Sequence, residues 1–321
     1  MLNQFNQILQ KWMPLITPAS VVIGIVFYES LDNYMFLVPW IFAVMTFTGS
    51  LRSNFHDLKK VFQHPLPLLV ALLTLHLLMP LIAFGTGTLF FHDDPYIVTG
   101  LILAFVIPTG ITSLLWVTIY QGNVVLTLSI ILVDTLLSPI VVPAMLQWLV
   151  GSSVEMDVVA IMNGLLWMIV IPSLLGMITN QYLEKSKTEK LAATLSPFSK
   201  LGIGAVVAIN SSGIAPYVTK VDTRLLSIIV VVFLLALAAY GIGWISGKML
   251  KAKRSTTISM MYNSGMRNIS AGAVIAITYF PAPVAIPVIV GMLFQQVLAS
   301  LVGSVMDKRK LPLNTDRVVS R

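Results

Sequence analysis

The sequence contains no cysteine and few charged residues, and these two shortages exclude several classes of protein. Without cysteine the chain can form no disulfide, thiolate metal site or cysteine nucleophile. Only 10% of the residues are charged, whereas soluble globular domains carry about 25%. No polar stretch is long enough for a separate soluble domain. Metal-ligand clusters, phosphate-binding glycine loops and nucleophile elbows are also missing from the sequence, so we do not expect an enzyme.

Apolar residues are abundant instead, at 57% of 321 residues, and the mean hydropathy is +0.89. A water-soluble chain of this size could not bury so much apolar surface. One membrane span takes roughly 20 residues, so the length allows about ten spans with short loops. We therefore expect an all-α polytopic membrane protein. No cleavable signal peptide and no Arg/Ser-rich transit peptide is recognisable, which favours a bacterial inner membrane.

The apolar runs predict ten spans, several of them interrupted by glycine or proline. They cover about residues 13–29, 36–51, 65–90, 96–120, 124–150, 157–182, 198–218, 225–249, 255–279 and 283–306.

The distribution of lysine and arginine orients these spans. If the N-terminus is cytoplasmic, all but three of the 20 Lys and Arg residues fall on the cytoplasmic side. The exceptions are Lys220 and Arg224 in an outer loop and Arg267 within a span. An odd number of spans would place the basic run 308–310 outside. We therefore expect both termini in the cytoplasm, with a basic cytoplasmic tail at 307–321.

Two short segments at matching positions indicate an inverted repeat. An offset of 155 residues superimposes Thr109–Ser113 on Ser264–Asn268, each in the fourth span of a five-span half. Five is an odd number, so the two halves must face opposite ways, as in many transporters. We expect one transporter domain over residues 1–321, with repeats at about 13–150 and 157–306.

Helix breakers and polar side chains lie at mid-membrane in both segments. Pro108 removes a backbone donor and Gly110 loosens the next turn, and lipid cannot satisfy the freed backbone groups. The helical halves that follow each break present N-termini, which attract anions. Two breaks in matching positions favour a binding site over simple kinks.

Arg267 and Asp134 are the charged residues that fall well inside the predicted spans. Intramembrane charges are rare and usually functional. Either the two form a buried structural ion pair, or Arg267 binds a substrate carboxylate while Asp134 carries a proton or orients the arginine. The sequence leaves both open, and a pair that opens to accept an anion would combine them.

Other polar residues at membrane depth also have two interpretations. His76, four residues before Pro80, is either a packing residue or a member of the site. Gln295 and Gln296 in the tenth span, and the polar residues 210–212 in the seventh, either form interhelical hydrogen bonds or line a cavity. For the two glutamines we favour the cavity.

Several segments of the sequence are similar to the bile acid:sodium symporter family. They are Phe42–Leu51 with Asp57–Pro65, the run from Pro108 through Gly122-Asn123-Val124 to Ser138-Pro139 and Pro143, and Asn263–Gly272. The resemblance extends over the whole chain in length and span number. It implies a panel of spans 1, 2, 6 and 7 and a core of spans 3–5 and 8–10, whose broken fourth and ninth helices cross. It also implies transport of organic anions such as bile acids, steroid sulfates or pantoate, with two sodium ions behind the crossing.

The sequence departs from that family pattern at the sodium ligands. The glutamate before the ninth-span break falls at Asn263, and the glutamine one turn later falls at Arg267. Leu114 and Ile131 replace two further ligands. Like charges about 4 Å apart cost roughly 4 kcal/mol at an effective dielectric of about 20, so Arg267 disfavours a neighbouring sodium ion. The positions that keep the pattern are Ser113, Thr127 and Asn268.

We interpret the chain as a secondary active transporter of a small organic anion that works by alternating access. The alternative is a sodium-independent carrier using Arg267, by proton coupling, exchange or uniport; a remoter one is a membrane sensor without flux. The expected partners are the anion and the lipid bilayer, and no nucleic acid. Sodium is the candidate ion, and we expect no other cofactor. The chain is expected to be a monomer or a weak homodimer. Predicted substrate-binding residues are Thr109, Thr112, Ser113, Ser264, Arg267, Asn268, Gln295 and Gln296. Predicted ion- or proton-coupling residues are His76, Ser113, Thr127, Asp134 and Asn263, of which Ser113 and Asn263 are the candidate sodium ligands.

Overall fold

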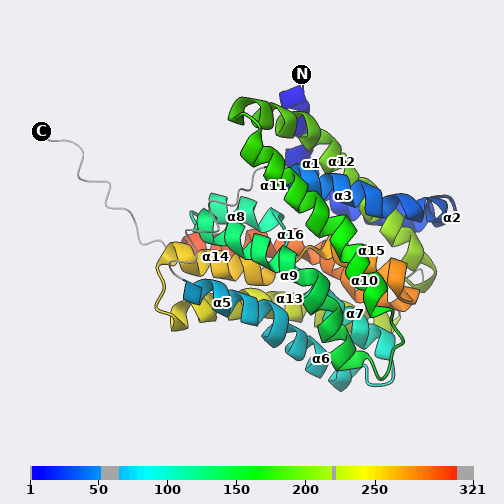
Figure 1. Ribbon diagram of the computed structural model, residues 1–321. Helices are drawn as coiled ribbons and strands as arrows, with labels where there is room; N and C mark the ends of the chain where they lie inside the picture. Colours follow the sequence, from blue (N-terminus) through cyan, green and yellow to red (C-terminus); the bar gives the residue numbers. More distant parts are fainter. Residues whose placement is uncertain (1, 52–64, 219–221, 309–321) are drawn as a thin grey trace, which may run out of the picture.

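The computed structural model of the chain describes residues 2–51, 65–218 and 222–308, and nearly all of them are helical (Figure 1). In these ranges the extended backbone pairing is one isolated bridge between Thr109 and Arg267. The predicted cytoplasmic loop after the second span and the predicted tail from residue 309 lie outside the described residues. The prediction of an all-α protein is confirmed.

The helices follow the predicted apolar runs. In the first half they are α1 (Leu2–Val26), α2 (Tyr28–Leu31), η1 (Asp32–Leu37), α3 (Val38–Ser50), α5 (Pro65–Leu73), η2 (Thr74–Leu78), α6 (Met79–Phe90), α7 (Pro95–Val106), α8 (Thr112–Ile119) and α9 (Val124–Val150). In the second half they are α10 (Val158–Leu165), η3 (Leu166–Val170), α11 (Ile171–Tyr182), α12 (Lys185–Val218), α13 (Thr223–Met249), α14 (Arg254–Gly265), α15 (Ile269–Tyr279), η4 (Ala282–Val284) and α16 (Ala285–Lys308).

Six helical segments of the described chain are long and apolar enough to cross a membrane, and a bent pair over residues 282–306 would make a seventh. The chain is therefore a multi-pass membrane protein. Fewer segments than ten satisfy this length, partly because the fourth and ninth apolar runs are each split by a break. Their apolar parts, α7 and α15, are too short to cross alone.

Side-chain caps fix several helix starts. Asp94 accepts hydrogen bonds from the backbone of α7, Asp157 from α10 and Asp222 from α13, while Asn123 caps α9. Such oxygens satisfy N–H groups that have no partner within the helix. Three acidic residues of the predicted outer loops therefore begin helices.

The helix α12 begins at Lys185, well before the predicted start of the seventh span near residue 198. Its first turns are rich in Lys and Glu, which are good helix formers. These residues are too polar to join an apolar run, so hydropathy alone missed the beginning of the helix.

Two helices contain a widened π-helical turn just before a proline. The turn η2 precedes Pro80 in α6, and η3 precedes Pro172 in α11. Proline lacks an N–H group and crowds the carbonyl four residues earlier, and a wide turn relieves this conflict.

The helices pack in two groups (Figure 1). In one, α1 packs on α12, and α3 packs on α11 and α12. In the other, α13 packs on α14 and α16, α7 packs on α6 and α16, and α9 packs on α14. Figure 1 shows α1, α3 and α12 in its upper part and α5, α6 and α13 in its lower part. Both breaks belong to helices of the second group.

Candidate functional site

The two helix breaks meet and pair with each other; we call residues 107–111 together with 266–268 the break junction. The N–H of Gly110 donates to the carbonyl of Met266 at 3.2 Å, and the N–H of Asn268 donates to the carbonyl of Pro108 at 2.7 Å. Backbone groups freed by each break are thus satisfied by the other break, as a membrane interior requires. Gly110 permits this approach, because a Cβ there would lie 2.9 Å from the carbonyl oxygen of Arg267.

Thr109 and Arg267 face each other in this bridge, so their own backbone groups point outward. Side chains from two neighbouring helices bind two of these groups, the Thr109 N–H and the Arg267 carbonyl. Oδ2 of Asp134 on α9 accepts the Thr109 N–H at 2.7 Å, and Nε2 of Gln295 on α16 donates to the Arg267 carbonyl at 2.9 Å. The junction is therefore held by α9 on one side and by α16 on the other.

Asn263, at the end of α14, is a buried hydrogen-bonding centre. Its Nδ2 donates to Thr127 Oγ1 at 3.1 Å and to the Ser259 carbonyl at 2.7 Å. Its Oδ1 accepts from the Ser113 hydroxyl at 3.3 Å, and its own carbonyl accepts from the Thr109 hydroxyl at 3.0 Å. The oxygens that would surround a sodium ion here are already engaged with the Asn263 amide.

His76 lies within η2, and its Nε2 approaches Oδ1 of Asp134 to 2.7 Å. This distance is that of a charge-assisted hydrogen bond, although its angle departs from the preferred one. Because Asp134 is fully buried and also holds Thr109, the pair sits directly against the junction.

Arg267 carries a buried guanidinium, and the side chain is 2% exposed. None of its three side-chain nitrogens has a hydrogen-bond partner among the residues that the structure describes. It makes no ion pair with Asp134, whose oxygens contact Thr109 and His76 instead. The direct Arg267–Asp134 pair, one of the two interpretations of the sequence, is therefore not formed in this conformation.

A small internal cavity of about 10 Å³ adjoins Arg267. That volume holds about one water molecule. Its walls come from α7, α13, α14, α15 and α16 and are mainly apolar, with Tyr240 and Gln295 as the polar groups beside the arginine. The site is thus closed around Arg267 in this conformation.

The remaining predicted site residues lie around the junction with different degrees of involvement. Thr112 is half-buried at the start of α8, and Asn268 is half-buried before α15. Ser264 is buried, and its hydroxyl has no hydrogen-bond partner in the described part of the chain. The side chain of Gln296 lies outside the described residues.

Sequence reasoning missed two residues that support the site, Ser259 and Tyr240. The Ser259 hydroxyl donates to the Asn123 carbonyl at 2.9 Å, so it ties α14 to the start of α9. Tyr240 lines the Arg267 cavity and packs edge-on against Tyr262. Ser259 lies one helical turn before Asn263, a spacing that could have revealed it; no local signal identifies Tyr240.

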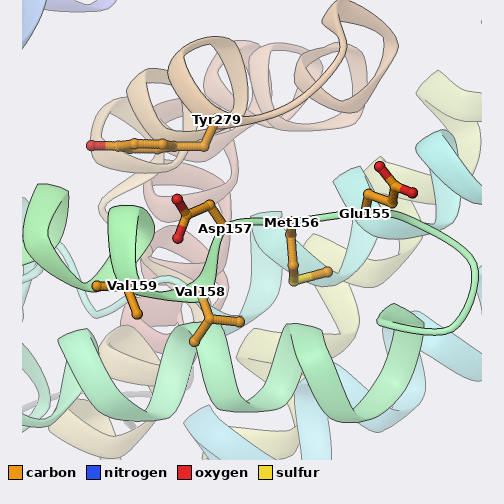
Figure 2. A pocket seen from close by; sticks show the side chains of 6 residues that line it. All are labelled: Glu155, Met156, Asp157, Val158, Val159 and Tyr279. Atoms are coloured by element: carbon orange, nitrogen blue, oxygen red, sulfur yellow. The ribbon is translucent and has the colours of Figure 1, made fainter.

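A second hollow lies at the surface, between the loop before α10 and the end of α15 (Figure 2). It is lined by Glu155, Met156, Asp157, Val158, Val159 and Tyr279. Tyr279 ends a helix that starts ten residues earlier, which places it about 15 Å along the axis from the junction. The hollow is open and acidic, so it does not suit an anion.

Two helices interrupted at a shared backbone bridge are the feature that the sequence resemblance implied for a transporter. The buried arginine beside the bridge is this chain's departure from the family pattern. A family model, described as the sodium bile acid symporter family, matches residues 39–221. The chain belongs to this family.

The chain is also similar over most of its length to individual proteins, two of which are named as sodium-dependent transporters or cotransporters. The chain is 54% identical over 299 residues to the uncharacterized protein YbaS of Bacillus subtilis, covering 93% of this chain and 98% of that protein. It is 23% identical over 267 residues to the uncharacterized sodium-dependent transporter YocS of Bacillus subtilis, covering 83% and 82%. It is 24% identical over 320 residues to the probable sodium/metabolite cotransporter BASS2, chloroplastic, of Oryza sativa subsp. japonica, covering 97% and 74%.

Membership in this symporter family confirms the predicted resemblance and makes the chain a transporter rather than an enzyme. The family match ends at residue 221 and therefore includes the first break but not the second. Asn263 and Arg267 lie beyond the matched region.

Proposed function

We propose that the protein is a secondary transporter of a small organic anion, which Arg267 binds at the break junction during alternating access. The observation that carries this proposal is the buried guanidinium of Arg267, which has no hydrogen-bond partner among the described residues. A buried guanidinium whose donors are all unused is strongly unfavourable, and a carboxylate from outside the chain would accept hydrogen bonds from it. The guanidinium offers a planar pair of donors that matches a carboxylate.

The surroundings of Arg267 support an anion for a second reason. The helices α8 and α15 both begin next to the junction, and helix N-termini favour negative charge. Apolar walls beside the arginine suit the carbon skeleton of an organic anion. Since the cavity holds about one water molecule, the helices around it must separate before a metabolite can enter.

Sodium does not fit the Asn263 position in this chain. A sodium ion needs oxygen ligands with free lone pairs and a nearby negative charge. Here the Asn263 amide donates to Thr127 and to the Ser259 carbonyl, and the permanent charge of the arginine lies four residues further on. The proposed carrier therefore binds its anion without sodium, although relatives are named as sodium-dependent transporters.

The proposed architecture has ten spans in two inverted halves. The helical segments that satisfy the membrane length, together with α1 and the two broken runs α7–α8 and α14–α15, make ten crossings. The packing of α1, α3, α11 and α12 as one group agrees with a panel that slides against the remaining helices. The proposed location is the inner membrane of a bacterium, with both termini in the cytoplasm.

Anion binding to Arg267 is testable by thermal unfolding in detergent with pyruvate, pantoate or taurocholate. We expect at least one of them to stabilise the protein equally in sodium and in potassium. A ligand at 100 times its dissociation constant adds about 2.7 kcal/mol. Arg267→Gln should weaken this binding at least about tenfold, since hydrogen bonds to charged groups contribute about 1.5–3 kcal/mol.

The matched control is Arg224→Gln, because Arg224 is half-exposed and pairs with Asp94 at 2.8 Å on the surface. This variant should bind the anion like the unmodified protein. Stabilisation that persists in Arg267→Gln, or that requires sodium in the unmodified protein, would overturn the proposal.

A further inference from the structure

A buried histidine–carboxylate pair lies directly beside the break junction. His76 is 9% exposed and Asp134 is fully buried, and Nε2 of His76 lies 2.7 Å from Oδ1 of Asp134. At this distance the two atoms are close enough to share a proton, although the angle departs from that of a good hydrogen bond. The pair therefore holds one proton at a net charge of −1, or two protons at a net charge of zero.

The second proton is carried at Nδ1 of His76. This atom has no hydrogen-bond partner among the described residues, so no fixed donor or acceptor locks its protonation state. His76 lies in the wide turn η2, beside Asp134. Pro80 follows the turn and crowds the backbone carbonyl four residues earlier, which is the carbonyl of His76. The similar turn η3, before Pro172, contains no titratable residue.

Few other ionisable groups surround the pair. Of the helices that pack against η2, α5 and α6 carry no titratable side chain, α7 carries Tyr96, and α9 carries Asp134 itself. The remaining charged group at the junction is Arg267, which faces Thr109 across the backbone bridge. The charge at this site is therefore set by Arg267, by the histidine–aspartate pair and by whatever anion is bound.

From this charge balance we propose that His76 and Asp134 form a proton site that takes up one proton with each monovalent anion held by Arg267. The inference rests on the proposed anion function. Arg267 is permanently positive, so with one proton in the pair the empty site is neutral. An anion would leave an uncompensated negative charge in a medium of low dielectric, and the second proton removes it.

A physical link joins the two sites. Oδ2 of Asp134 accepts the N–H of Thr109, and Thr109 lies opposite Arg267 in the bridge. An ionised carboxylate accepts hydrogen bonds more strongly than a neutral group. With the second proton on Nδ1 of His76, Asp134 stays ionised and keeps its hydrogen bond to Thr109, but the imidazolium now competes for its charge, so the hold of α9 on the junction weakens when the anion is present.

The first test needs no anion and uses the protein with ¹⁵N-labelled histidine in phosphatidylcholine nanodiscs. We expect the ring nitrogens of His76, assigned through their loss in His76→Gln, to report uptake of a proton between about pH 9 and about pH 5. Asp134→Asn keeps an oxygen for Thr109 but removes the charge, and it should shift the midpoint of this change. An unchanged protonation state of His76 over this range would overturn the proton site.

The second test measures binding of pyruvate, pantoate and taurocholate as a function of pH. In the unmodified protein the affinity should fall up to about tenfold per pH unit on the alkaline side, because proton and anion binding are reciprocal. His76→Gln should bind with an affinity independent of pH, and in Asp134→Asn the pH dependence should shift together with the midpoint of His76. His92→Gln, which alters an exposed loop histidine, should behave like the unmodified protein.

The two failures are distinguishable. Anion binding that depends on Arg267 but not on pH would overturn the proton coupling and leave the proposed function standing. Absence of binding for all three anions at every pH would overturn the proposed function, while the histidine spectra would still decide whether His76 and Asp134 exchange a proton.

Discussion

At the scale of single residues, one neutral side chain connects three helices beside the break junction. Asn263 on α14 donates to Thr127 on α9 and accepts from Ser113 on α8. A carboxylate in this place could accept from both hydroxyls but would face the Ser259 carbonyl without a proton to donate. The amide thus satisfies, without any charge, a set of oxygens that would otherwise call for a cation.

Asn263→Asp should therefore create a sodium requirement that the unmodified protein lacks. In potassium the new buried charge should lower the free energy of unfolding by about 3 kcal/mol or more. Sodium should restore part of that loss, because the carboxylate, the two hydroxyls and the Ser259 carbonyl form an oxygen-rich site. Thermal unfolding in sodium and in potassium at equal ionic strength measures both effects.

Asn263→Ala is the control, since it should be destabilised equally in both salts. A sodium-specific rise in the melting temperature of the unmodified protein, or none in Asn263→Asp, would contradict this account.

The sequence could identify most of these residues but not their partners. Arg267, Asp134 and His76 stand out because ionisable groups are rare in apolar runs. Which of them meet depends on the packing of η2 on α9 and on the pairing of two breaks far apart in the chain. Residue type alone left the Arg267–Asp134 pair open, and the structure instead brings His76 to Asp134.

At the scale of helices, local chemistry predicted boundaries well where one signal dominates. The helix α9 spans the predicted residues 124–150, because Asn123 caps its start and the apolar run continues past Pro139. The break after α7 was predicted from Pro108 and Gly110. The widened turn η2 was not, since it depends on how one helix accommodates a proline within tertiary packing.

Gly110→Ala tests whether the two breaks depend on close backbone contact. The added Cβ would lie 2.9 Å from the Arg267 carbonyl oxygen, and backbone cannot move aside cheaply. We expect a loss of about 1–3 kcal/mol in the free energy of unfolding, together with loss of anion binding. Denaturant unfolding in detergent and the anion-dependent shift in melting temperature provide the two measurements.

The corresponding control is Gly85→Ala in α6. Gly85 is exposed, and a Cβ there meets no atom within 4 Å. This variant should be as stable as the unmodified protein or slightly more stable, because alanine loses less backbone entropy than glycine in a helix. Equal effects of the two substitutions would refute a special role for the junction.

At the scale of the whole molecule, charge and helix length together determine how the chain crosses the membrane. The basic residues fall on one predicted side, and acidic residues of the other side cap α7, α10 and α13. Arg224 at the start of α13 pairs with Asp94 at the start of α7, so two predicted outer loops are tied together. A reversed orientation would place the basic loops outside, which the lysine and arginine rule disfavours.

Because the natural chain has no cysteine, single introduced cysteines report their side of the membrane without background. Glu155 is exposed before α10 and Lys187 is exposed after α11, and the segment Val158–Tyr182 between them is long enough to cross the bilayer. We expect Glu155→Cys to react with a membrane-impermeant maleimide in intact cells, and Lys187→Cys to react only after the membrane is opened. Ser138→Cys, buried within α9, should stay unlabelled in both conditions. Labelling of both exposed positions from the same side would refute the crossing, and the opposite pattern would reverse the orientation of the whole carrier.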